Sequence, residues 1–108
     1  MSKSQRSKGA RGQSTVARML ADRDWVVDPI TSGVMREDMI ATDCDGRQFS
    51  VEVKNTATIT RAHVKQAMTQ AEARKLPWML LNKIEGTSSW LVRRKGEKPV
   101  VWHEKEET

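Results

Sequence analysis

The stretch "RQFSVEVKNT", residues 47–56, has the alternation of a β-strand and decides how the rest of the chain is interpreted. Successive side chains of a strand point to opposite faces, so Phe49, Val51 and Val53 share one face while Glu52 and Lys54 share the other. An exposed strand often carries such a charged pair for solubility alone. A carboxylate and a lysine at this spacing would also suit a site that holds a metal ion and a water molecule.

The segment before this strand predicts a β-hairpin, with strands over residues 38–43 and 47–54 joined by "CDG". A two-residue turn at "DG" would place Asp38 and Glu52 on opposite faces of the sheet, whereas a three-residue loop at "CDG" would bring them face to face. Three-residue hairpin loops commonly end in a residue with positive φ, which suits Gly46. We therefore predict the three-residue loop and a shared face for the two carboxylates.

Two carboxylates opposed across neighbouring strands repel each other unless a cation or a proton lies between them. A hard divalent ion such as Mg²⁺ suits the all-oxygen site of Asp38 and Glu52, and it can also take the backbone carbonyl of Val53. Such an ion would polarise a phosphate and activate a bound water, and Lys54 could position that water or offset the charge on the phosphate. The alternative is that Glu52 and Lys54 form an ordinary solvated pair and that Asp38 caps a strand.

The remaining sequence predicts an α/β fold, a small mixed β-sheet flanked by helices. A strand, a helix and a second strand follow one another from residue 47 to 84, which is enough chain for a parallel β-α-β crossover. The core order is α-β-β-β-α-β, followed by two further short strands. The predicted elements are a helix over residues 13–24 capped by Ser14 or Gly12, a strand at "WVVDPI" closed by Pro29, the hairpin, a helix from the cap Thr60 to about Lys75, and strands at "WMLLNKI", "SSWLVRR" and "PVVWHE".

Charge divides the chain into three parts: a flexible basic arm over residues 1–10, a single domain over 11–103 and an acidic tail over 104–108. The formal net charge is +5, and without the tail 18 basic and 11 acidic side chains remain, a net charge of +7. Such a body suits a polyanion, because each neutralised phosphate releases counterions; basic excess that serves solubility is the alternative. The absence of a long apolar run or a basic amphipathic helix argues against a membrane partner. Cys44 is the only cysteine, which favours a reducing, cytoplasmic compartment.

Together these motifs resemble the PD-(D/E)XK nuclease superfamily, since "RED" precedes "MIA" and "VEVK" follows. More narrowly, "KGARGQSTVARMLADRDWVV", "TSG", "EDMIA" and "FSVEVKNT" are similar in order and spacing to archaeal-type Holliday junction resolvases and their small phage relatives. The resemblance covers about residues 8–93. It implies a restriction-endonuclease-like core and an endonuclease that hydrolyses DNA phosphodiesters, most like a resolvase of branched DNA, with Mg²⁺ as cofactor and Mn²⁺ as its substitute.

Carried over position by position, the resemblance makes Asp38 and Glu52 the metal-binding carboxylates and Lys54 the catalytic lysine. Ser32 matches a polar residue that contacts the scissile region. The sequence departs from the family pattern at Gln13, where a Glu is usual in the first helix. An amide there can still ligate through oxygen, but it adds no charge, which favours one-metal chemistry. A helix cap or a buried amide is the alternative for Gln13.

Further residues are candidates for DNA contact rather than for chemistry, although a solvated surface is the alternative for each. His63 and Gln66 lie on a polar stripe of the second predicted helix, where they could touch a phosphate or a water. The complete set of predicted DNA-binding residues is Lys8, Arg11, Ser32, Arg36, Arg61, His63, Lys65 and Gln66. The run Arg93, Arg94 and Lys95 is as compatible with DNA contact as with plain surface.

Three functions remain open on the sequence alone. The first is the Mg²⁺-dependent endonuclease, expected to be a homodimer because one small subunit carries one site and two strands need cutting. The second is a DNA-binding protein that keeps the nuclease fold without catalysis, which Gln13 motivates. The third is an assembly subunit whose basic surface binds an acidic protein.

Overall fold

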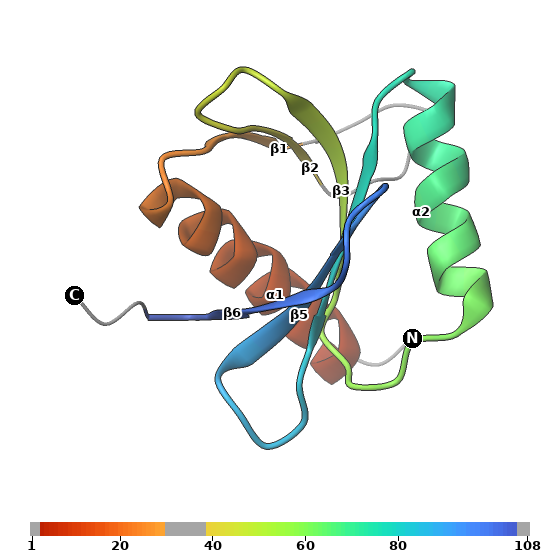
Figure 1. Cartoon of the computed structure of the whole chain (residues 1–108). Helices are drawn as coiled ribbons and strands as arrows, with labels where there is room; N and C mark the ends of the chain where they lie inside the picture. Colours follow the sequence, from red (N-terminus) through yellow and green to blue (C-terminus); the bar gives the residue numbers. More distant parts are fainter. Residues whose placement is uncertain (1–2, 30–38, 106–108) are drawn as a thin grey trace.

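The computed structural model describes residues 3–29 and 39–105, which form one six-stranded mixed sheet between two helices (Figure 1). The strands lie in chain order across the sheet, and α1 and α2 cover opposite faces. The α/β class predicted from the sequence is confirmed. The elements are α1 (Lys3–Asp22), β1 (Val26–Pro29), β2 (Met39–Thr42), β3 (Gln48–Lys54), α2 (Arg61–Ala73), β4 (Trp78–Lys83), β5 (Ser89–Arg94) and β6 (Val100–His103).

The hairpin of β2 and β3 has the predicted three-residue loop. Met39 pairs with Val51, and the backbone N–H of Asp43 donates to the carbonyl of Arg47 at 2.9 Å. Gly46 ends the loop with φ of 84°, the left-handed conformation that favours glycine. The predicted register is therefore confirmed over the described strands. Asp38 lies outside the described residues, so its place opposite Glu52 stays a prediction.

Asp43 locks this loop through its side chain. Its carboxylate accepts hydrogen bonds from the backbone N–H groups of Asp45 (3.0 Å) and Arg47 (2.9 Å) and from Nε of Arg47 (2.8 Å). Desolvation acts to raise the pKa of Asp43, but these hydrogen bonds and the Arg47 charge outweigh it and lower the pKa. The ionised carboxylate therefore stabilises the loop that sets the β2–β3 register.

The β3–α2–β4 segment is the predicted parallel crossover, with Glu52 beside Leu80 and Lys54 beside Asn82. The helix begins after the predicted cap: Oγ1 of Thr60 accepts the backbone N–H of His63 at 3.3 Å, and Nδ1 of His63 accepts that of Thr60 at 3.2 Å. This capping box satisfies two backbone donors that the first helical turn leaves unpaired.

The hydrophobic core lies between α1 and the sheet. It contains the odd-numbered residues of β3, as predicted, and large side chains of α1. Small residues face the sheet from α2, where Ala67 and Ala71 are buried and Leu80 is fully buried beneath the helix. The buried members of the α1-side core are Val16, Met19, Leu20, Met39, Ala41, Phe49, Val51, Val53, Met79, Leu81, Trp90 and Val92.

The first helix is longer than predicted, because α1 begins at Lys3 and not near Gln13. Residues 3–10, predicted as part of a flexible arm, have helical backbone, and the predicted caps at Gly12 and Ser14 are wrong because both residues lie inside the helix. Gly12 has a packing role instead: a Cβ there would lie 2.9 Å from Cβ of Asn55, so the helix passes close to the end of β3. Neither helix, over the part of the chain that the structure describes, is long and apolar enough to cross a membrane.

The last described segment is also tied to the domain more firmly than predicted. Glu104, placed at the start of an acidic tail by its charge, forms an ion pair with Lys83 and accepts a hydrogen bond from Nε1 of the buried Trp90 at 3.0 Å. Desolvation acts to raise the pKa of Glu104, but the bonds from Lys83 and Trp90 outweigh it and lower the pKa. The ordered packing thus extends to Glu104.

Candidate functional site

Glu52 is a buried carboxylate in the middle of the sheet. Its side chain faces α2, only 5% of its surface is exposed, and its neighbour on β4 is the fully buried Leu80. Nζ of Lys54, two residues along on the same face, lies 3.7 Å from Oε1 of Glu52. The alternative of an ordinary solvated pair is therefore wrong for Glu52. Burying a carboxylate costs several kcal/mol before compensation, so such a residue indicates a role other than stability.

The strand order explains why the pair is buried and yet reachable. β3 has β2 on one side and β4 on the other, so Glu52 is shielded within the sheet. Lys54 ends β3 and is 25% exposed, at the edge where the parallel strands β3 and β4 both terminate. The chain returns to this edge at the N-terminus of α2 (Figure 1). Ligands of α/β sheets commonly bind at the carboxyl ends of parallel strands, and the Glu52–Lys54 pair lies at such an end.

Two further polar residues share this face: Asn82, which was not predicted as a site residue, and Arg93, which belongs to the basic run for which DNA contact and plain surface were left open. Asn82, 5% exposed, is the direct neighbour of Lys54 on β4. Nη1 of Arg93 on β5 donates to Oδ1 of Asn82 at 2.7 Å. The sequence feature that could have indicated a site here is Asn82 itself, because a single amide interrupts the apolar run "WMLLNKI". We define these four residues, Glu52, Lys54, Asn82 and Arg93, as the polar strip.

The oxygen donors at Glu52 and Val53 are of the kind that a hard divalent ion binds. Glu52 supplies a carboxylate, and the Val53 carbonyl belongs to the same strand. Within residues 3–29 and 39–105, no group of three or more His, Cys, Asp or Glu side chains is placed to hold a metal. Asp38, the other carboxylate predicted to bind the metal, lies outside this range, so its part in a metal site stays a prediction.

Gln13 lies on α1 close to the same end of β3, one residue after the contact of Gly12 with Asn55. Gln13 lies inside α1, so the alternative of a helix cap is wrong, and its side chain is exposed, so the alternative of a buried amide is wrong as well. The predicted role beside the metal stays a prediction.

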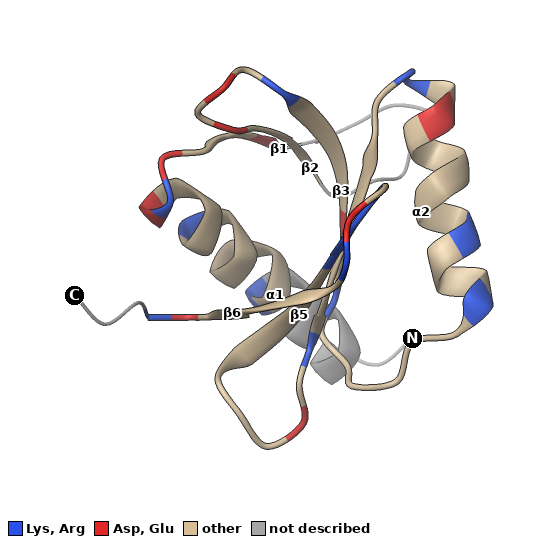
Figure 2. Ribbon diagram, in the orientation of Figure 1, with Lys and Arg blue, Asp and Glu red and all other residues tan. Residues whose placement is uncertain are grey.

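The predicted DNA-binding residues fall into three groups. Arg61, Lys65 and Gln66 are exposed on α2, and Arg11 is exposed on α1, so these four are accessible. Figure 2 shows basic residues at both ends of α2. His63 has a structural role in the capping box, which the sequence did not predict. Ser32 and Arg36 lie outside the described residues, as does the side chain of Lys8.

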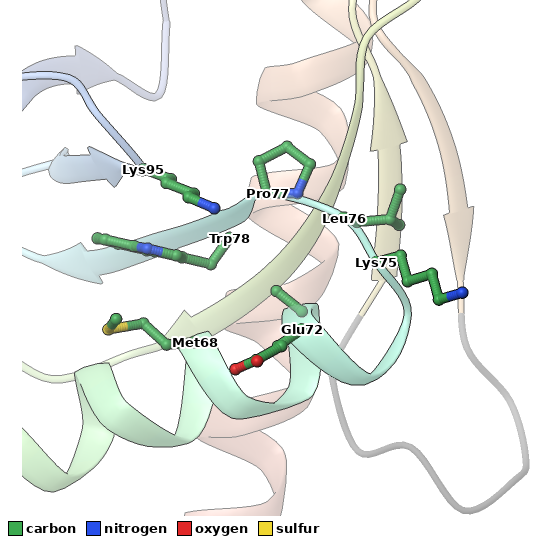
Figure 3. Close-up of a pocket in the computed structure, with 8 residues that line it drawn as sticks. Met68, Glu72, Lys75, Leu76, Pro77, Trp78 and Lys95 are labelled. Atoms are coloured by element: carbon green, nitrogen blue, oxygen red, sulfur yellow. The ribbon is translucent and has the colours of Figure 1, made fainter.

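A hollow of about 630 Å³ lies at the other end of α2, away from the polar strip. The side chains of Met68 and Trp78 both line it and extend in the same direction, and Lys95 lies on the far side of Trp78 (Figure 3). Met68 is 47% exposed, high for a large apolar side chain. The hollow is lined by Met68, Ala71, Glu72, Lys75, Leu76, Pro77, Trp78 and Lys95.

The arrangement of helices and strands is similar to that of a solved protein, a Holliday junction resolvase from the hyperthermophilic archaeon Archaeoglobus fulgidus. The alignment covers 89% of this chain and 84% of the resolvase, with a TM-score of 0.62 and 17% sequence identity. The two chains share a fold. No protein-family model matches the chain, and no curated protein matches it by sequence.

Proposed function

We propose that this protein is a metal-dependent endonuclease that hydrolyses phosphodiester bonds of branched DNA. The observation that carries the proposal is the buried Glu52 beside Lys54 on β3, in a chain with the fold of a Holliday junction resolvase. The basic body of the chain supports a polyanionic substrate. A DNA substrate and the single Cys44 favour an intracellular site of action, and the resemblance to small phage endonucleases makes a phage origin part of the proposal.

In the proposed site, Asp38, Glu52 and the carbonyl of Val53 would hold Mg²⁺, which Mn²⁺ should be able to replace. The ion would supply Lewis-acid polarisation of the phosphate and a more acidic bound water. Lys54 would orient the attacking water through its ammonium group or offset the negative charge that develops on the phosphate. The sheet itself fixes the spacing of Glu52 and Lys54, so little reorganisation would be needed when DNA binds.

We further propose that the protein acts as a homodimer, since one subunit offers one such strip and a junction needs two cuts. The exposed Met68 and the hollow beside it are the surface we assign to the second copy, because they present apolar side chains at the far end of α2 from the strip. Sedimentation should give twice the 12.3 kDa mass of the chain, and a monomer at micromolar concentration would exclude this arrangement.

A DNA-binding protein without catalysis is the second candidate, and Gln13 is the observation that favours it. The amide adds no negative charge where the resembling family has a carboxylate, so a second metal would bind weakly. Under the leading proposal the consequence is one-metal chemistry or slow turnover; under the second candidate it is loss of cleavage.

Cleavage of a labelled four-way junction separates the two candidates. Purified protein should cut the junction in Mg²⁺ or Mn²⁺, and excess EDTA should stop the reaction because it removes the ion that would polarise the phosphate and activate the water. Linear duplex of the same sequence serves as the control for branch preference. Tight, salt-dependent binding without cleavage in either metal would support the second candidate. Absence of any DNA affinity would contradict both candidates and favour the third function, an assembly subunit that binds an acidic protein.

A further inference from the structure

Arg93 differs from Arg47 and Arg94 in its partner. Arg47 pairs with Asp43 at 2.8 Å and Arg94 with Glu97 at 3.1 Å, so their charges are balanced by acids. Arg93 is partly buried, and its hydrogen-bond partner among the described residues is the neutral amide of Asn82. A guanidinium held in this way keeps most of its positive charge available for an anion.

The register places Arg93 beside the proposed chemistry. Direct neighbours in adjacent strands share a face, so Glu52, Leu80 and Arg93 form one row across β3, β4 and β5. Two strand spacings separate the Cα atoms of Glu52 and Arg93, roughly 10 Å. α2 packs on β3 and β4. Arg93, on β5, therefore lies beside the helix and is not covered by it.

Asn82 holds the guanidinium of Arg93 in position. Its side chain is almost fully buried, and Oδ1 accepts from Nη1 of Arg93 at 2.7 Å. The other half of the Asn82 amide is its NH₂ group, which is a hydrogen-bond donor. Lys54, Asn82 and Arg93 therefore present donors or positive charge on one face, a set that suits the oxygens of a phosphate.

We propose that Arg93, positioned by Asn82, binds a DNA phosphate next to the one that, in the proposed function, is hydrolysed by water at the Glu52–Lys54 pair. This inference rests on the proposed function for the location of the cut, and it adds a substrate-binding residue on β5. Asn82 is a positioning residue that acts through Arg93. The DNA strand would then cross the sheet from β3 toward β5, in line with the row Glu52, Leu80 and Arg93.

The test measures binding of a four-way junction in EDTA over a range of salt concentrations, so that it does not depend on cleavage. Arg93→Gln should weaken binding roughly tenfold and reduce the slope of log affinity against log salt by about 0.9, the loss of one phosphate contact. Arg94→Gln is the matched control, because it removes the same charge from the same strand at a residue already paired with Glu97. That control should keep the wild-type slope.

Two more variants exclude a folding artefact. Arg93→Lys keeps the charge but loses the planar fork, so we expect an intermediate affinity and the wild-type slope. Asn82→Asp retains Arg93 but gives it an acid partner, and it should reproduce the lower slope of Arg93→Gln in a protein with a normal thermal unfolding transition. A structural role alone would not change the salt slope.

The outcomes separate this inference from the proposed function. If Arg93→Gln and Arg94→Gln have the same slope and affinity, the assignment of Arg93 is overturned, whether or not the wild-type protein cleaves DNA. If Arg93→Gln lowers the slope while the wild-type protein cuts no junction in Mg²⁺ or Mn²⁺, the phosphate site stands and the nuclease proposal fails.

Discussion

Glu52 and Lys54 are the residues at which burial and function conflict. A strand that served stability alone would place an apolar side chain at position 52, since its neighbour Leu80 is fully buried. The chain keeps a carboxylate there and places an ammonium 3.7 Å away. Residues that break a local folding rule are common at functional sites, which is why this pair carries the proposal.

A substitution at Glu52 tests this conflict directly. Glu52→Gln removes the charge at nearly constant volume, so the free energy of unfolding should stay the same or rise by up to about 1 kcal/mol. Junction cleavage should fall below detection in the same variant. Urea denaturation and a cleavage assay measure the two effects, and a loss of stability with normal cleavage would show that Glu52 has a structural role.

At the scale of elements, the β2–β3 hairpin was the most predictable part of the fold. The turn residues specified the loop length, the loop length fixed the register, and Gly46 has the required positive φ of 84°. The helix α2 was predictable for a similar reason, since Thr60 is a favoured N-cap residue and marks where the helix begins. In both cases a local signal a few residues long determines the structure.

The start of α1 could not be predicted in this way. Residues 3–12 lack an apolar stripe and contain Gly9 and Gly12, which lower helix propensity by about 1 kcal/mol each, so the pattern indicated a flexible arm. Asn82 was missed for a different reason. Its place beside Lys54 depends on the parallel register of β3 and β4, which no turn residue specifies.

The hairpin makes a prediction at its own scale. Gly46→Ala should lower the free energy of unfolding by about 1 kcal/mol, because a Cβ disfavours the left-handed conformation even though nothing lies within 4 Å to clash with it. Gly46→Asn is the control and should cost less, since Asn tolerates this conformation. Thermal unfolding of the two variants gives the comparison, and equal stability of Gly46→Ala and the wild type would contradict the loop assignment.

At the scale of the whole molecule, the polar strip and the apolar hollow lie toward opposite ends of α2. The polar strip and the start of the helix lie at one end, while the exposed Met68 and the hollow of Figure 3 lie toward the other. Under the proposed function, this separation would let one surface bind DNA while another contacts a second copy. The sequence predicted the basic body and the need for two cuts, but it did not locate the apolar surface, because Met68 and Trp78 come together only in the folded chain.

The rate of junction cleavage by Lys54→Ala tests the central claim most directly. Lys98→Ala is the matched control, because Lys98 is an exposed lysine in the turn before β6 and outside the strip. With enzyme in excess and Mg²⁺ present, Lys54→Ala should cleave on the order of 10²–10⁴-fold more slowly than the wild type while binding the junction with similar affinity. Lys98→Ala should cleave at the wild-type rate. Cleavage by Lys54→Ala at the wild-type rate would contradict the claim that the Glu52–Lys54 pair is the catalytic site.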